Sequence, residues 1–137
     1  MTLVLDASMA IAWMFGDERT EGTVAAMRRI VVEGAIVPSL WRLKVANVLR
    51  NAVRRGRCDE GYVDRSLDRL GQYPITVDDE TSVQAWSATR VLARELGLTV
   101  YDAAYLELAK RSGLPLASCD QALIAAARAS GVEMLTG

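Results

Sequence analysis

The chain has 137 residues, of which 51% are hydrophobic, and a formal net charge of −1, so we expect one globular domain, residues 1–137, with a single apolar core. It contains no histidine, which excludes Ser-His-Asp and Cys-His nucleophile systems, an imidazole general base and zinc sites that require histidine. Its two cysteines, Cys58 and Cys119, lack a Cys-x-x-Cys spacing, so we expect two free thiols in a reducing cytoplasm. No apolar run approaches the roughly 20 residues of a membrane helix, so we expect a protein that does not contact a membrane.

Short runs with strand character alternate with longer stretches that have helical spacing. In chain order we predict a strand at 3–5, helices at 7–15 and 20–33, a strand at 35–37, helices at 39–55 and 59–71, a strand at 75–77, helices at 80–96 and 102–112, a strand at 116–117, a helix at 120–130 and a strand at 132–134. This alternation predicts an α/β fold, a three-layer sandwich in which a central parallel sheet of about five strands is flanked by helices.

Three aspartates, Asp6, Asp102 and Asp120, lie at or near the starts of predicted helices, and two of them closely follow predicted strands. In open parallel sheets, ligands bind beyond the carboxyl ends of the strands. We expect Asp6 and Asp120 to project at that edge, whereas Asp102 opens a helix. Because carboxylate oxygens favour hard cations, the pattern predicts a site for Mg²⁺ or Mn²⁺.

Helix capping is the alternative role for each aspartate. Taken alone, Asp6 fits the role of a helix N-cap as well as that of a metal ligand. Thr99 together with Asp102 resembles a capping box. Ser118 and Gln121 could cap the last predicted helix, which would leave Asp120 without a capping role. Three neighbouring carboxylates repel by about 4 kcal/mol per pair at 4 Å and an effective dielectric near 20, so a cluster needs a cation or altered protonation.

Four motifs, in this order and spacing, resemble those of PIN domains and, more narrowly, of VapC toxins from bacterial VapBC toxin–antitoxin pairs. They are Val4-Leu5-Asp6-Ala7-Ser8, Pro38-Ser39-Leu40-Trp41 running into Val45-Ala46-Asn47-Val48-Leu49, Tyr101-Asp102-Ala103-Ala104-Tyr105, and Ser118-Cys119-Asp120. The resemblance covers essentially the whole chain.

The resemblance implies an endoribonuclease toxin of a type II toxin–antitoxin system that uses Mg²⁺ or Mn²⁺ to activate water for attack on a phosphodiester. It matches Asp6 and Asp102 to the principal metal-binding aspartates of the family and Asp120 to a further acidic position. Ser8 and Ser118 match small polar neighbours that hold a ligand water. The implied partners are an RNA substrate, such as tRNA or another structured RNA, a cognate antitoxin and a second copy of the chain in a homodimer.

Lys44 departs from the family pattern, because the resemblance implies an active-site glutamate at this position. The spacing of its helix alone favours a solvated residue beside an apolar stripe. The family match instead places Lys44 in the catalytic pocket, where an ammonium group cannot bind Mg²⁺ and would weaken its binding. Lys44 then marks an impaired enzyme, either through an inactivating substitution or as a naturally degenerate copy. The alternative is a catalytically dead module that only binds RNA or antitoxin.

A group of arginines stands near the end of the third predicted helix, and two more lie on the next helix: Arg50, Arg54, Arg55 and Arg57, with Arg65 and Arg69. They could bind RNA phosphates, or they could form a solvated helix end that the helix dipole favours. Two other classes of α/β protein fit the chain less well. A phosphoacceptor receiver domain would need an acidic pair near the first strand and a lysine after a late strand, and a dehalogenase-type phosphatase would need an aspartate where Ser8 stands.

Overall fold

The computed structural model describes residues 2–137 and contains five strands and eight helices in that range. The strands are β1 (Leu3–Leu5), β2 (Ala35–Val37), β3 (Ile75–Val77), β4 (Leu116–Ser118) and β5 (Met134–Thr136). The helices are α1 (Ala7–Met14), α2 (Glu21–Glu33), α3 (Trp41–Arg54), α4 (Glu60–Leu70), α5 (Thr81–Gln84), α6 (Ala88–Leu96), α7 (Val100–Ser112) and α8 (Gln121–Ala129).

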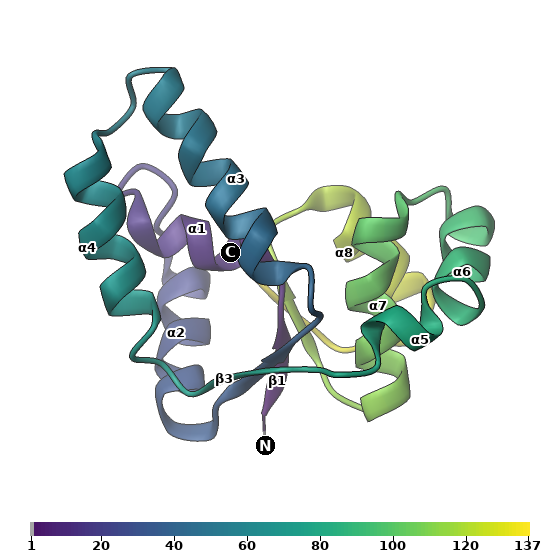
Figure 1. Cartoon of the computed structure of the whole chain (residues 1–137). Coiled ribbons are helices and arrows are strands. Elements are labelled where there is room, and N and C mark those ends of the chain that lie inside the picture. The colour runs from purple at the N-terminus through teal and green to yellow at the C-terminus, as the bar shows by residue number, and fades with distance from the viewer. Residues whose placement is uncertain (1) are drawn as a thin grey trace.

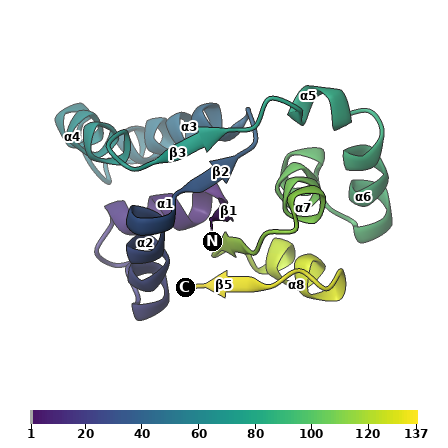
Figure 2. The ribbon, with the colours of Figure 1, turned by 90° about the horizontal axis from the view of Figure 1, so that it is seen from below.

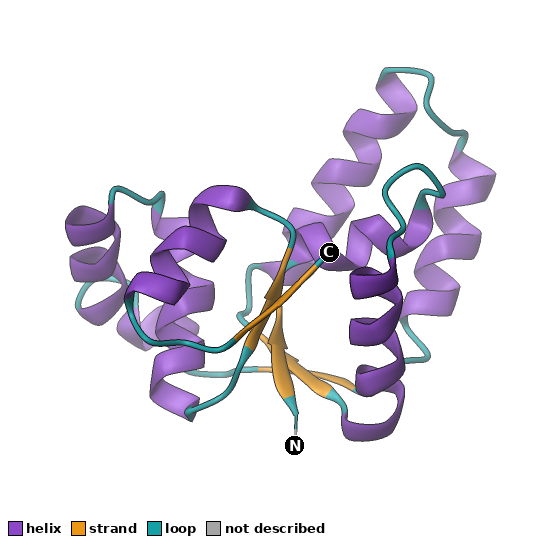
Figure 3. Cartoon of the chain, turned by 180° about the vertical axis from the view of Figure 1, so that it is seen from behind, coloured by secondary structure: helices purple, strands orange, loops and turns teal. Residues whose placement is uncertain are grey.

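All the strands pair in parallel, in the order β3-β2-β1-β4-β5 (Figure 2). Helices α1 to α4 lie on one side of this sheet and α5 to α8 on the other, as the views from the front and from behind show (Figures 1 and 3). The expected three-layer α/β sandwich with a five-stranded parallel sheet is therefore confirmed. Strand β1 and residues 103–109 of α7 supply much of the core, since their side chains are almost completely buried.

Local sequence explains several helix boundaries. Thr20 forms a reciprocal capping box with Thr23 at the start of α2, and Asp59 accepts a hydrogen bond from the Tyr62 backbone N–H at the start of α4. Gly113 ends α7 in the left-handed conformation, at φ 66°, which glycine adopts without a steric penalty.

Most predicted helix ends differ from the structure by one or two residues, and three differences change the description of an element. The helix expected at 80–96 is two helices, α5 and α6, separated by residues 85–87. The last strand is Met134–Thr136 rather than 132–134, because its register is set by pairing with β4, which short-range patterns do not reveal. Helix α7 begins two residues earlier than expected, so Asp102 lies within its first turn.

None of the helices formed by residues 2–137 has the length and apolar character needed to cross a membrane.

Candidate active site

Strands β1 and β4 are neighbours in the sheet. Strands β2 and β3 follow on the far side of β1, and β5 follows on the far side of β4, so the strand order reverses between β1 and β4. Such a switch point leaves an open crevice beyond the carboxyl ends of the two strands. Asp6 directly follows β1, and its backbone N–H donates to the Ala117 carbonyl of β4 at 2.9 Å. Ser118 ends β4. Topology therefore brings together two segments that are more than 100 residues apart in sequence.

The Asp6 carboxylate is only 4% exposed and is held by two serines. The hydroxyls of Ser8 and Ser118 donate to its Oδ2 atom at 2.6 and 2.8 Å. Ser8 Oγ also accepts from the Cys119 backbone N–H at 2.9 Å, and Ser118 Oγ from the Asp120 N–H at 3.0 Å. Asp6 occupies an N-cap position on α1 but makes no side-chain capping bond. One of its hydrogen bonds comes from Ser8 in the first turn of α1 and the other from Ser118 at the end of β4, so the carboxylate links the two segments that meet at the site.

The other two aspartates reach the same cavity from the starts of two helices. Asp102 lies in the first turn of α7, where its backbone N–H donates to Thr99 Oγ1 at 3.1 Å. Asp120 is the N-cap of α8 and accepts from the Leu123 N–H at 3.0 Å through Oδ1. The expectation that Ser118 would cap this helix and leave Asp120 free was wrong, because the Ser118 hydroxyl donates to Asp6 instead.

These three aspartates line one cavity of about 430 Å³ together with Ser8 and Lys44. Lys44 projects there from α3, whose buried positions Trp41, Val45, Leu49 and Ala52 hold the opposite side of the helix against the core. The prediction from spacing alone was a solvated helix edge. The structure shows that Lys44 is exposed and also faces the acidic cavity.

Burial and mutual repulsion set the electrostatics of this cavity. Burial raises the pKa of the Asp6 carboxyl, the hydrogen bonds from its two serines oppose that rise, and the charges of Asp102 and Asp120 add to it. The pKa of Asp102 is also raised, first by burial and then by the charge of Asp120, while the positive charge of Lys44 lowers it. Lys44 therefore supplies part of the countercharge that the carboxylates require.

Glu18 also lines the acidic cavity, which the sequence did not predict. It lies in the connection between α1 and α2, where its Oε2 atom accepts from Arg57 Nη1 at 2.6 Å. The same guanidinium bonds Asp17 Oδ1 at 2.6 Å and lies 3.9 Å from the centre of the Phe15 ring. No sequence signal marks Glu18, because its place depends on the path of a loop. Arg57, expected among RNA-binding arginines, is already engaged with these two acids.

The donor atoms of the cavity suit a hard divalent ion, since carboxylate and hydroxyl oxygens are the ligands that Mg²⁺ and Mn²⁺ prefer. The arrangement is more open than a formed metal site. Within residues 2–137, no three or more aspartate, glutamate or cysteine side chains form a group that could hold a metal ion. Lys44 places a cation among the same carboxylates. The side chains thus fit such an ion in chemistry, and binding would require them to draw together.

Comparison with known proteins places the chain among related sequences. A model of the PIN domain family matches residues 3–129. The chain is 31% identical over 123 residues to ribonuclease VapC3 of Pyrobaculum aerophilum, covering 90% of this chain and 92% of that protein. It is 32% identical over 124 residues to ribonuclease VapC3 of Mycobacterium tuberculosis, covering 88% and 84%.

Solved structures share the fold. The crystal structure of PAE2754 from Pyrobaculum aerophilum matches with a TM-score of 0.71 and 25% identity, covering 98% of this chain and 90% of that one. The structure of FitAcB from Neisseria gonorrhoeae matches with a TM-score of 0.63 and 20% identity, covering 98% and 96%. At the latter identity the likeness concerns the fold alone.

Proposed function

This chain belongs to the PIN domain family and is of the VapC ribonuclease type, and we propose that it is a toxin of a type II toxin–antitoxin system whose metal-dependent endoribonuclease centre is weakened by Lys44. The observation that carries the proposal is the position of Lys44 in the same cavity as Asp6, Asp102 and Asp120. A lysine on a face of α3 turned away from this cavity would not weaken the binding of a metal ion there.

In the proposed reaction the three aspartates would hold Mg²⁺ or Mn²⁺. When bound, the ion would lower the pKa of a water molecule and neutralise charge on the phosphate under attack. Ser8 and Ser118 keep the Asp6 carboxylate fixed through their two hydrogen bonds. Ser8 also lines the cavity and is placed to orient water there, whereas Ser118 is fully buried, is not among the lining residues and acts through Asp6. No histidine is required, because the carboxylates and bound water carry the proton transfers.

Lys44 acts against this arrangement through its charge. Its side chain stands where the family pattern has a glutamate, so the cavity loses one negative charge and gains one positive charge. Two unit charges 5 Å apart interact by about 3 kcal/mol at an effective dielectric near 20, which corresponds to about a hundredfold in binding. A loss of metal affinity of at least that order is expected.

A binding module without catalysis is the second candidate, and the same lysine favours it. An ammonium group among carboxylates partly neutralises them, as its effect on Asp102 indicates. The cavity could then accept an RNA phosphate without a divalent ion. Cleavage by the unaltered chain at any metal concentration would exclude this candidate.

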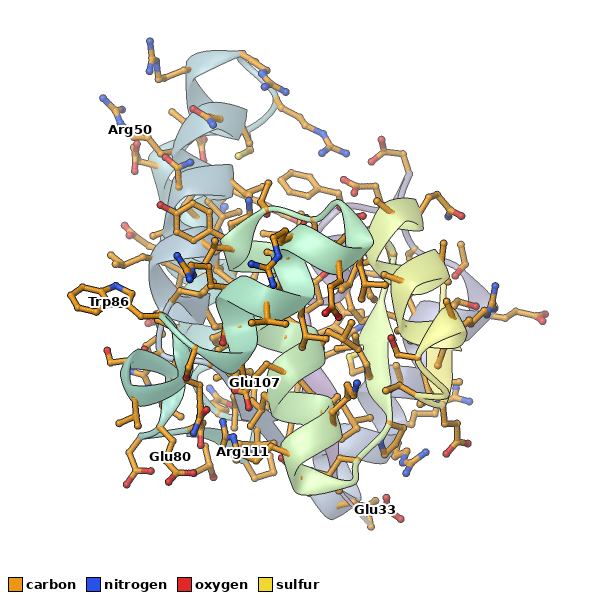
Figure 4. All side chains as sticks on the ribbon, turned by 90° about the vertical axis from the view of Figure 1, so that its right-hand side faces the viewer. Glu33, Arg50, Glu80, Trp86, Glu107 and Arg111 are labelled. Atoms are coloured by element: carbon orange, nitrogen blue, oxygen red, sulfur yellow. The ribbon has the colours of Figure 1, made fainter. Side chains whose placement is uncertain are left out.

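The proposed partners are an RNA substrate, a cognate antitoxin and a second copy of the chain. An antitoxin is expected because the chain is of the VapC type. Trp86, at the junction of α5 and α6, supports a protein interface, since 90% of its surface is exposed and the side chain stands clear of the ribbon (Figure 4). Light scattering on the isolated chain should give twice the mass of one chain. The free Cys58 and Cys119 suit a reducing cytoplasm.

The test of the enzymatic proposal compares the chain with its Lys44→Glu variant. Mn²⁺ binding is measured by calorimetry and cleavage of a labelled RNA pool across a Mg²⁺ or Mn²⁺ titration. We expect Lys44→Glu to bind Mn²⁺ about a hundredfold more tightly or better and to gain metal-dependent cleavage.

Arg42→Glu is the matched control. Arg42 lies on the same helix and the substitution changes charge by the same two units, but Arg42 lines a groove beside α4 rather than the acidic cavity. It should leave Mn²⁺ affinity nearly unchanged. Equal metal-dependent cleavage by the chain and by Lys44→Glu would show that Lys44 does not impair the site.

A further inference from the structure

A second cavity, of about 320 Å³, lies directly beside the acidic one. Glu18 and Cys119 line both cavities and form the wall that they share. Burial, and then the charges of Asp6 and Glu18, raise the pKa of the Cys119 thiol. This thiol therefore stands between the floor of the acidic cavity and the second cavity.

One face of α8 forms a long side of the second cavity. Gln121, Ile124 and Arg128 all line it, and their spacing of three and four residues puts them on the same side of the helix. Asp120, which caps α8, lines the acidic cavity. Arg128 follows eight residues later, about 12 Å along the helix axis. Helix α8 therefore begins at the acidic cavity and runs along the second cavity.

The chemistry of the second cavity suits a phosphate. Arg128 is exposed, and within residues 2–137 it makes no ion pair. A planar guanidinium binds phosphate through two parallel hydrogen bonds, and the Gln121 amide, about two turns away along the same face of α8, offers further donors to the strand. Glu18 is the acidic residue of this cavity, and its charge is offset by its ion pair with Arg57. Arg128 is thus available to an anionic ligand.

We propose that the second cavity is a subsite for the RNA backbone next to the acidic cavity, and that Arg128 binds a phosphate there. The inference rests on the ribonuclease function proposed above. An acidic cavity repels the phosphates that flank the one it receives, so cations beyond its rim must hold the strand. Arg128 is placed for this role along the face of α8 that starts at the acidic cavity.

The test measures binding of a fluorescein-labelled, single-stranded 12-nucleotide RNA by fluorescence anisotropy, in EDTA so that no cleavage occurs, between 50 and 200 mM salt. Arg128→Ala should weaken binding about fivefold or more and reduce the slope of log affinity against log salt by about 0.7, the value for one phosphate contact on a single strand. Arg128→Lys keeps the charge and should restore most of the slope.

Arg94→Ala is the control for the loss of one positive charge. Arg94 is an exposed residue of α6 that lines neither cavity, so its removal should leave the slope unchanged. Circular dichroism confirms that each variant is folded. If Arg128→Ala and Arg94→Ala give the same affinity and slope as the unaltered chain, the subsite is wrong while the ribonuclease proposal stands. If the unaltered chain binds no RNA under these conditions, the subsite is wrong, and the ribonuclease proposal is decided separately by the Lys44→Glu cleavage titration.

Discussion

Arg111, near the end of α7, joins three carboxylates, two from the segment after β3 and one from its own helix (Figure 4). Its guanidinium donates to Asp78 at 2.8 and 3.2 Å, to Glu107 at 2.8 and 3.1 Å, and to Glu80 at 2.9 Å. Asp78 and Glu107 are 7% and 5% exposed. The network fastens the segment after β3 to α7, the helix that carries Asp102.

Replacing Arg111 with methionine removes the cation and leaves two buried carboxylates unpaired. Breaking a buried ion pair in this way costs about 3 to 5 kcal/mol. The Arg111 side chain is 25% exposed, so water screens part of the effect, and we expect the lower end, a loss of about 3 kcal/mol in the free energy of unfolding at pH 7. Urea denaturation followed by circular dichroism measures this loss.

The loss should depend on pH in a defined direction. Hydrogen bonds from Arg111 hold the pKa of the Asp78 carboxyl below its ordinary value. The stability that Asp78 contributes is therefore fully present above the unfolded pKa of about 3.9 and disappears as the pH falls through the lower folded pKa. The difference between the two proteins should accordingly shrink below about pH 4.

Lys110→Met is the control, because Lys110 is the exposed neighbour on the same helix and, among the described residues, makes no ion pair. It should change the free energy of unfolding by less than about 0.5 kcal/mol. The reasoning would be refuted if Arg111→Met were destabilised by no more than Lys110→Met at pH 7, or if its destabilisation stayed constant down to pH 3.

Two further substitutions test close packing and the proposed dimer. Gly22→Ala should lower the free energy of unfolding by about 2 kcal/mol or more, measured by thermal denaturation, because the added methyl would lie 2.1 Å from the Thr136 carbonyl oxygen. Gly16→Ala is the control and should be nearly neutral, because no atom lies within 4 Å of the added methyl. Equal melting temperatures of the two variants would contradict the prediction. Trp86→Ser should weaken dimer formation about tenfold or more, measured by light scattering on dilution, and an unchanged dissociation constant would remove Trp86 from the interface.

Much of the fold follows from local sequence. The apolar runs at 3–5, 35–37 and 75–77 are strands within the predicted bounds, because short runs of β-branched and apolar residues favour strands; β1 and β2 are largely buried, whereas the edge strand β3 is partly exposed. The split between α5 and α6 was missed. Helical spacing continues through residues 85–87, so the pattern alone contains no sign of the interruption there.

The candidate site, like the fold, could be predicted from the sequence only in part. Residue type and spacing suggested a cluster of Asp6, Asp102 and Asp120, the family resemblance added Lys44, and all four line one cavity in the structure. The sequence did not predict which partner each side chain would choose. Ser118 bonds Asp6 rather than capping α8, because strand pairing between β1 and β4 sets those two side chains together.

The sequence by itself thus determined the alternation of strands and helices and the absence of histidine chemistry, since these depend on residue type and short spacing, while the resemblance to PIN domains indicated which residues share the acidic cavity. Only the tertiary structure decided that β1 and β4 are neighbours, that Glu18 enters the acidic cavity and that Arg128 lies along a second one. These features join segments far apart in the chain, so they are fixed by strand order and loop path, which local patterns do not encode.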